Sequence, residues 1–361
     1  MTIRVMSSGR SADQRAHPRP SSKVAGTAWP VSVLFMLSPL IGEIVGAALR
    51  FSYLTQPLRV AAILCFYGAG AVLVREAVQR RGLNGWGLLL LALAFAVLEE
   101  GLGLQTIFNP QGMDGETVYG RAFEVNWMWA VVVTGYHAVW SIVIPIVLTH
   151  LLFPAKQHIV WLSRPMLGVF GGVFAVGFVL FVFISLVRSD FRLSAVQIIG
   201  AVLAVIALVW SATGCRRPWA TTSRGRCPEP ATVGVVGFGA GLAWLMLYVV
   251  AFIGSAAPFV VWTLAALVFA AAVAGIMRRW VARPGWSRRH RLNGCLGAVL
   301  ALWLFGLFLV ANGGRTDDVV FHVVVLAAVA VGYLWLRRRI HPYGTAPETG
   351  RRAGEGSAAG G

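Results

Sequence analysis

Two adjacent carboxylates, Glu99 and Glu100, close an apolar run that begins at Trp86 and is long enough to cross a bilayer. A charged side chain at the centre of a bilayer costs about 3 kcal/mol or more, so such residues usually mark a function or a buried partner. Carboxylates in this setting suit proton exchange, cation binding or general-base chemistry. The pair therefore indicates where a functional site of this chain would lie.

Other ionisable residues are expected at a similar depth. A helix rises about 1.5 Å per residue, so Glu43 and Glu99, each 13 residues into its apolar run, reach the same level. His137 lies ten residues into a run that crosses in the opposite direction, near the middle of the membrane. We therefore predict Glu99, Glu100 and His137 as the functional residues, with Glu43 beside them.

The run that carries His137 also has a polar face. Its members are separated by multiples of three or four residues, which places them on one side of a helix: Asn126, Thr134, His137, Ser141 and Pro145. Because Pro145 has no N–H to donate to the carbonyl of Ser141, that carbonyl becomes a free acceptor. We predict that this face supports a polar pocket among the first, third and fourth spans, opening outward.

Two local features complete this prediction. Glu99 and Glu100 differ by about 100° around an α-helix, so we expect only one of them to face the pocket. The loop Thr106–Phe123 joins the third and fourth spans and is polar and rich in glycine. It is either a lid or recognition loop or a plain hairpin. Near the other membrane edge, Arg75 and Glu76 are expected to form an ion pair or to contact lipid.

The composition defines the elements that must position these residues. The chain has 361 residues, of which 57% are hydrophobic and only 12% are charged. Soluble domains carry about 25% charged residues, so the composition indicates an integral membrane protein. We predict an all-α fold, a polytopic helical membrane protein with about ten transmembrane helices. The apolar runs are 30–49, 58–78, 86–105, 127–152, 166–187, 193–213, 232–254, 258–277, 294–312 and 318–336.

The basic residues predict the orientation. The formal net charge is +17, but the arginines form short clusters between apolar runs, as the positive-inside rule expects, and not one basic face. We therefore predict both termini in the cytoplasm, a location in the bacterial plasma membrane, contact with the lipid bilayer and no nucleic-acid partner.

Four portions follow along the chain. We predict a disordered basic cytoplasmic tail at 1–28 and a disordered C-terminal tail at 340–361, because both segments are polar or rich in glycine and alanine. Between them, 29–155 forms a four-helix membrane portion that carries the pocket. The remainder, 156–339, forms a six-helix portion in which buried charge is scarce.

From Leu37 to Pro154 the sequence resembles a family of uncharacterised bacterial multi-pass membrane proteins. The resemblance implies a polytopic membrane fold and brings no known activity with it. The segments that carry it are Ser38–Glu43, Tyr67–Ala71, Arg75-Glu76, Glu99–Gly101, Phe108–Pro110, Val125–Trp127 and Tyr136–Ser141.

A weaker likeness is to the CAAX-protease/bacteriocin-processing intramembrane peptidases. Those enzymes use Glu-Glu-x-x-x-Arg, then Phe-x-x-x-His, then His-x-x-x-Asn or Asp on separate helices, and Glu99-Glu100 and His137 resemble the first two elements. Leu104 stands in place of the Arg, Val133 in place of the Phe, and the third element is missing from the next spans. The likeness implies Glu-His chemistry with a divalent metal.

These observations leave three functions open. The first is transport of a small solute or of protons through the carboxylate and histidine pocket, which a many-span fold with kinked helices favours slightly. The second is an intramembrane hydrolase in which a Glu acts as general base beside His137, and a divalent metal is expected only in this case. The third is a scaffold or accessory subunit. Whether the protein is an enzyme, its substrate and its oligomeric state stay open.

Overall fold

A computed structural model describes residues 26–112, 119–216 and 225–340. The predicted tails lie outside the described residues, apart from Gly26 to Ala28 and Ile340. Thr27 is buried and donates to the carbonyl of Trp161 at 2.9 Å, and the first helix begins at Ala28. The first span therefore starts two residues before the apolar run that predicts it.

Ten helical segments of the described residues are long and apolar enough to cross a membrane, which confirms the prediction of a polytopic all-α fold. Each segment coincides with one of the ten apolar runs. The spans are Ala28–Val45, Pro57–Arg81, Gly85–Gly103, Trp127–Leu152, Arg164–Arg188 (α7), Ala195–Gly214 (α8), Pro230–Ile253 (α9), Phe259–Val281 (α10), Arg288–Asn312 (α11) and Thr316–Arg339 (α12). The orientation of the termini stays a prediction.

Each of the first four spans contains a π-helical segment. The segments are Leu40–Val45 after α1 (Ala28–Pro39), Leu64–Gly68 between α2 (Pro57–Ile63) and α3 (Ala69–Arg81), Leu98–Gly103 after α4 (Gly85–Val97), and His137–Val143 between α5 (Trp127–Tyr136) and α6 (Ile144–Leu152). Each segment has a glycine within it or within two residues of it, and the first and fourth also have a proline, Pro39 and Pro145, within two residues. Both residue types weaken the regular α-helical hydrogen-bond pattern. Segments of this kind are rare and occur frequently at functional sites.

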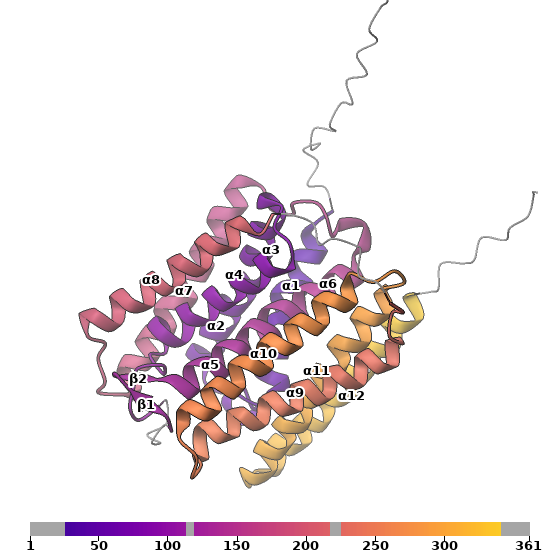
Figure 1. The fold of residues 1–361 in the computed structure, drawn as a ribbon. Coiled ribbons are helices and arrows are strands. Elements are labelled where there is room, and N and C mark those ends of the chain that lie inside the picture. The colour runs from indigo at the N-terminus through magenta and orange to yellow at the C-terminus, as the bar shows by residue number, and fades with distance from the viewer. Residues whose placement is uncertain (1–25, 113–118, 217–224, 341–361) are drawn as a thin grey trace, which may run out of the picture.

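The spans form three groups that lie side by side (Figure 1). The first four spans occupy the middle, α7 and α8 pack against α2 to α4 on one side, and α9 to α11 pack against α5 and α6 on the other. The last helix, α12, packs against α11 and against the end of the first span. A short hairpin of β1 (Arg121–Ala122) and β2 (Val125–Asn126) precedes α5. Residues 113–118 of the same loop lie outside the described part. About half of the residues in each of the first four spans are buried, whereas few residues of α7 and α10 are buried, so these two helices lie on the rim of the bundle.

The close contact between α9 and α11 depends on glycine. A side chain at Gly297 would place its Cβ 2.1 Å from the carbonyl oxygen of Gly234 and 2.7 Å from the backbone nitrogen of Phe238. Small residues at such crossings let two membrane helices approach until their backbones touch. The pair therefore forms the packed centre of the last four spans.

We expect Gly297→Val to lower the free energy of unfolding by about 1–3 kcal/mol or more, because backbone atoms cannot move aside for the added methyl groups. Unfolding by sodium dodecyl sulfate, followed by tryptophan fluorescence, would measure this change. The matched control is Gly239→Val on α9, where an added Cβ meets no described atom within 4 Å. An equal loss at both positions would contradict the assignment of a close crossing.

Candidate functional site

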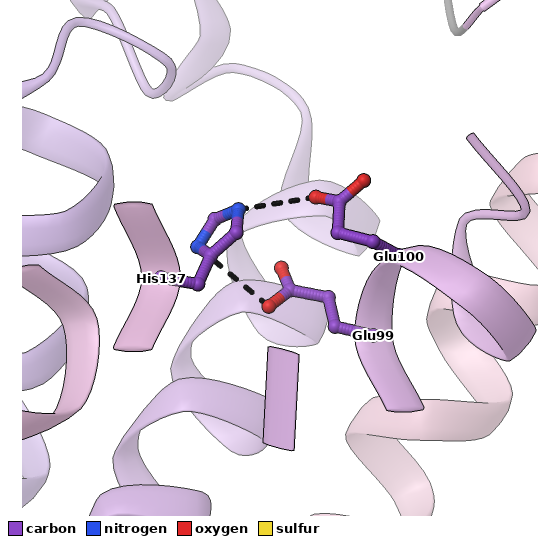
Figure 2. Close-up of side chains that lie close together, drawn as sticks. All are labelled: Glu99, Glu100 and His137. Carbon is purple, nitrogen blue, oxygen red and sulfur yellow. Dashed lines mark hydrogen bonds and ion pairs between the residues drawn. The ribbon is translucent and has the colours of Figure 1, made fainter. Parts of the chain in front are cut away.

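Glu99, Glu100 and His137 meet inside the bundle and are named here the Glu–His cluster. Figure 2 shows the imidazole of His137 between the two carboxylates, with one ring nitrogen facing each of them. The Nε2 atom lies 3.0 Å from Oε1 of Glu100, within hydrogen-bond distance. The Nδ1 atom lies 3.7 Å from Oε2 of Glu99, which is an ion-pair distance but too long for a hydrogen bond.

Both carboxylates therefore contact His137, and the expectation that only one faces the pocket is wrong. That expectation considered only the rotation between neighbouring residues of a regular α-helix. The two side chains do diverge, but both project from a widened π-helical turn, Leu98–Gly103. An imidazole ring has nitrogens on two different edges, so one ring can meet two diverging carboxylates.

The cluster is closed, which differs from the predicted outward-opening pocket. The exposed fraction is 0% for Glu99, 3% for Glu100 and 6% for His137. Tyr67 and Ser141 pack directly against the imidazole and are 2% and 0% exposed. The rings of Tyr67 and Tyr136 lie against the imidazole, with centroid separations of 5.6 and 4.9 Å, so access to the cluster requires these side chains to move.

The first span approaches the fourth through Gly42 and Ser38. A Cβ at Gly42 would lie 2.3 Å from Oγ of Ser141, and the hydroxyl of Tyr136 donates to the carbonyl of Gly42. Ser38 donates to the carbonyl of Ser141 at 2.6 Å. This is the acceptor that Pro145 was predicted to free, so the Ser141 carbonyl of the fourth span is a point where the first span attaches.

Glu43 reaches the same region as a result of this contact. It is 7% exposed and close enough to interact electrostatically with His137 and Glu100. Its Oε1 atom is buried and makes no hydrogen bond to any described residue. Ser141 is in the cluster itself, with its hydroxyl 3.2 Å from Nδ1 of His137.

Two of the predicted supporting residues lie apart from the cluster. The hydroxyl of Thr134 donates to the carbonyl of Ala130, 2.6 Å away within its own helix. Asn126 is fully buried and donates to the carbonyls of Thr106 and Asn109 at 2.8 and 2.7 Å. Asn126 therefore holds the loop between the third and fourth spans and does not contact His137.

The residues that sequence reasoning missed are Tyr67, Thr106 and Trp129. The hydroxyl of Tyr67 donates to Oε1 of Glu99 and lies 3.3 Å from Nδ1 of His137. Thr106 donates to Oε2 of Glu100, and Trp129 in turn donates to Thr106 at 2.9 Å. The one available signal was Tyr67 itself, a polar group inside an apolar run and next to Gly68.

The arrangement suits proton transfer better than metal binding. Ligand atoms of Glu99, Glu100 and His137 all lie within 4.8 Å of one another, so the three residues are a possible metal site. A single ion, however, can bond to only one nitrogen of the imidazole, and the two carboxylates face different nitrogens. Movement of side chains would be needed to bring all three onto one ion.

Comparison with known proteins identifies a family but no activity. Searches of curated proteins and of solved structures return no match. A model of an uncharacterized membrane protein family matches residues 32–341, which is most of the chain and includes every residue of the site. The protein belongs to this uncharacterized membrane protein family.

Proposed function

We propose that the protein is a proton-coupled transporter of small solutes in which the Glu–His cluster carries the proton. The observation that supports this most directly is that the two nitrogens of His137 face two different carboxylates. An imidazole can accept a proton at one nitrogen while it releases another from the opposite edge. Histidine and carboxylate chains inside membranes are typical of proton relays in pumps and transporters.

Tyr67 completes a continuous path between the carboxylates. A proton on Glu100 can pass to Nε2 of His137 while the proton on Nδ1 passes to the oxygen of Tyr67. The Tyr67 hydroxyl proton then passes to Glu99, with which it is already hydrogen-bonded. One proton leaves Glu100, one arrives at Glu99, and His137 and Tyr67 keep their net protonation.

The charges of the site support the same proposal. Glu43, Glu99 and Glu100 place three carboxylates around one imidazole, and all four groups are at least nine-tenths buried. A buried charge without a partner is costly, and protonated His137 can balance only one of the three. Protons on the other carboxylates would make the cluster neutral, and their release would make it strongly attractive to cations.

We expect Glu99→Gln and Glu100→Gln each to reduce protein-dependent proton movement by about 100-fold, because each removes one end of the relay. The purified protein would be placed in liposomes that contain the pH dye pyranine, with a potassium diffusion potential set by valinomycin. The internal pH would be followed with and without a panel of alkali cations, amino acids, sugars and amines.

Two further variants make the measurement specific. Tyr67→Phe removes one oxygen atom and is expected to slow proton movement as well. Thr134→Val changes a residue one turn from His137 on the same span. The Thr134 hydroxyl bonds only within its own helix, so the proton flux of this variant should equal that of the wild type. Absence of protein-dependent proton movement under all conditions, or equal flux in the wild type and the double Glu variant, would refute the proposal.

The hydrolase is the second candidate, and the possible metal site at Glu99, Glu100 and His137 is the observation that favours it. In that case His137 and one carboxylate would hold a divalent metal, and the other carboxylate would act as general base towards a water molecule. Metal analysis of the purified protein separates the two candidates. If the wild type binds one equivalent of zinc or manganese and His137→Gln binds none, the hydrolase is favoured over the transporter.

A further inference from the structure

A groove separates the start of α2 from the end of α7, on the rim of the bundle. It encloses a volume of about 220 Å³. The walls are apolar side chains that are largely exposed: Leu58 on α2, and Phe183 and Val187 on α7. Arg59 and Arg188 line the same groove, so it combines an apolar surface with two guanidinium groups.

The groove continues into a smaller polar crevice. The two share Ile184 and Arg188, and the crevice is otherwise lined by the loop that follows the third span and by the end of α7. Its polar groups include Asn109, Ser185 and Ser189, and Asn109 donates to the hydroxyl of Ser189 at 3.2 Å. Arg188 therefore stands between an apolar groove and a set of hydroxyl and amide groups.

The groove lies at the ends of two membrane-spanning helices, where the bilayer surface is expected. Arg188 is the last residue of α7 and Arg59 lies in the first turn of α2, so both guanidinium groups are at the ends of membrane-spanning helices. Arg59 is held in place by the ring of Tyr53, 4.2 Å from its guanidinium, and by a 3.1 Å hydrogen bond to the carbonyl of Ala48. A guanidinium has five N–H donors and pairs well with phosphate oxygens.

We infer that this groove binds an anionic phospholipid, with the lipid phosphate on Arg59 and Arg188. One acyl chain would start along Leu58, Phe183 and Val187 and continue over the exposed face of α7 into the bilayer. The charge of the two guanidinium groups matches the lipid phosphate, and the exposed apolar side chains beside them match an acyl chain.

Native mass spectrometry of the purified protein would test the site. The delipidated protein would be incubated with equimolar phosphatidylglycerol and phosphatidylcholine, and bound lipid would be counted. We expect at least a tenfold preference for phosphatidylglycerol in the wild type. The preference should disappear in Arg59→Gln/Arg188→Gln and be partly kept in Arg59→Lys/Arg188→Lys, which retains the charge but loses the paired geometry.

The matched control is Arg81→Gln/Arg164→Gln. It removes the same charge from exposed arginines at the opposite ends of the same two spans, and it should keep the tenfold preference. Equal loss in both double variants would show a general charge effect and overturn the inference, as would a wild type without preference. Displacement of the lipid by inorganic phosphate at equal concentration would assign the arginines to a free anion instead.

Discussion

Replacing His137 with glutamine should lower proton movement through the protein by about 100-fold or more, as much as Glu99→Gln and Glu100→Gln do together. The imidazole lies within 3.7 Å of both carboxylates. A glutamine amide can replace a hydrogen bond, but it cannot take up a proton at one atom and release another from a second atom. The proton flux into pyranine-loaded liposomes measures this change.

The combination of variants distinguishes a relay from separate contributions. Residues that act as one unit have strongly non-additive effects. The triple variant of Glu99, Glu100 and His137 should therefore move protons no more slowly than His137→Gln alone. Additive losses would indicate that each residue acts independently. Thermal unfolding of each variant is needed as a control, because the protein becomes less stable when two buried carboxylates lose their imidazole partner.

The membrane fold was predictable from hydropathy because each span must present a long apolar surface to lipid. The prediction was least accurate where polar residues extend a helix beyond its apolar run. The eleventh helix, α11, begins at Arg288, six residues before the run 294–312, because Ser287 and His290 form a capping box that hydropathy does not detect. Local capping chemistry, and not hydrophobicity, places that end.

The site was predictable in part because charged residues are rare at membrane depth. Glu99, Glu100 and His137 stood out for this reason, and the structure brings them together. Tyr67 was named only within the segment Tyr67–Ala71 that carries the family resemblance and was not assigned to the site, since an apolar run tolerates tyrosine without interruption. Thr134 was included because a regular helical period places it on the face of His137. Its hydroxyl donates instead to the carbonyl of Ala130 within the α-helix α5, so a shared helix face does not bring this short side chain to the cluster.

A second buried charged group lies outside the Glu–His cluster and holds the end of the first four spans. Arg75 and Glu76 are both fully buried, and their side chains form an ion pair of 2.8 Å. The guanidinium also donates to the carbonyls of Lys156 and Gln157 at 3.0 and 3.1 Å and lies 3.6 Å from the ring of Trp161. The sequence predicted an ion pair or a lipid contact, and the ion pair is confirmed.

This group fixes the connection between the fourth and fifth spans. The backbone nitrogen of Trp161 donates to Oε1 of Glu76 at 2.7 Å. Arg80 pairs with the other oxygen of Glu76 at 3.2 Å. Both carboxylate oxygens of Glu76 therefore have partners. The planar guanidinium of Arg75 is required to reach two carbonyls and an aromatic ring at once.

Replacing Arg75 with leucine should lower the free energy of unfolding by about 3–5 kcal/mol, because Glu76 then loses its fully buried partner and keeps only the partly exposed Arg80 to compensate its charge. Arg75→Lys should recover little of the loss, since an ammonium lacks the planar fork and the contact with Trp161. The double variant Arg75→Leu/Glu76→Leu should be more stable than Arg75→Leu alone, because it also removes the buried carboxylate that has lost Arg75. Unfolding in sodium dodecyl sulfate measures the stability of all three variants. The control is Arg81→Leu, which changes an exposed arginine on the same helix and should stay within about 0.5 kcal/mol of the wild type. A loss for Arg75→Leu no larger than that of the control would show that the buried pair does not hold the spans together.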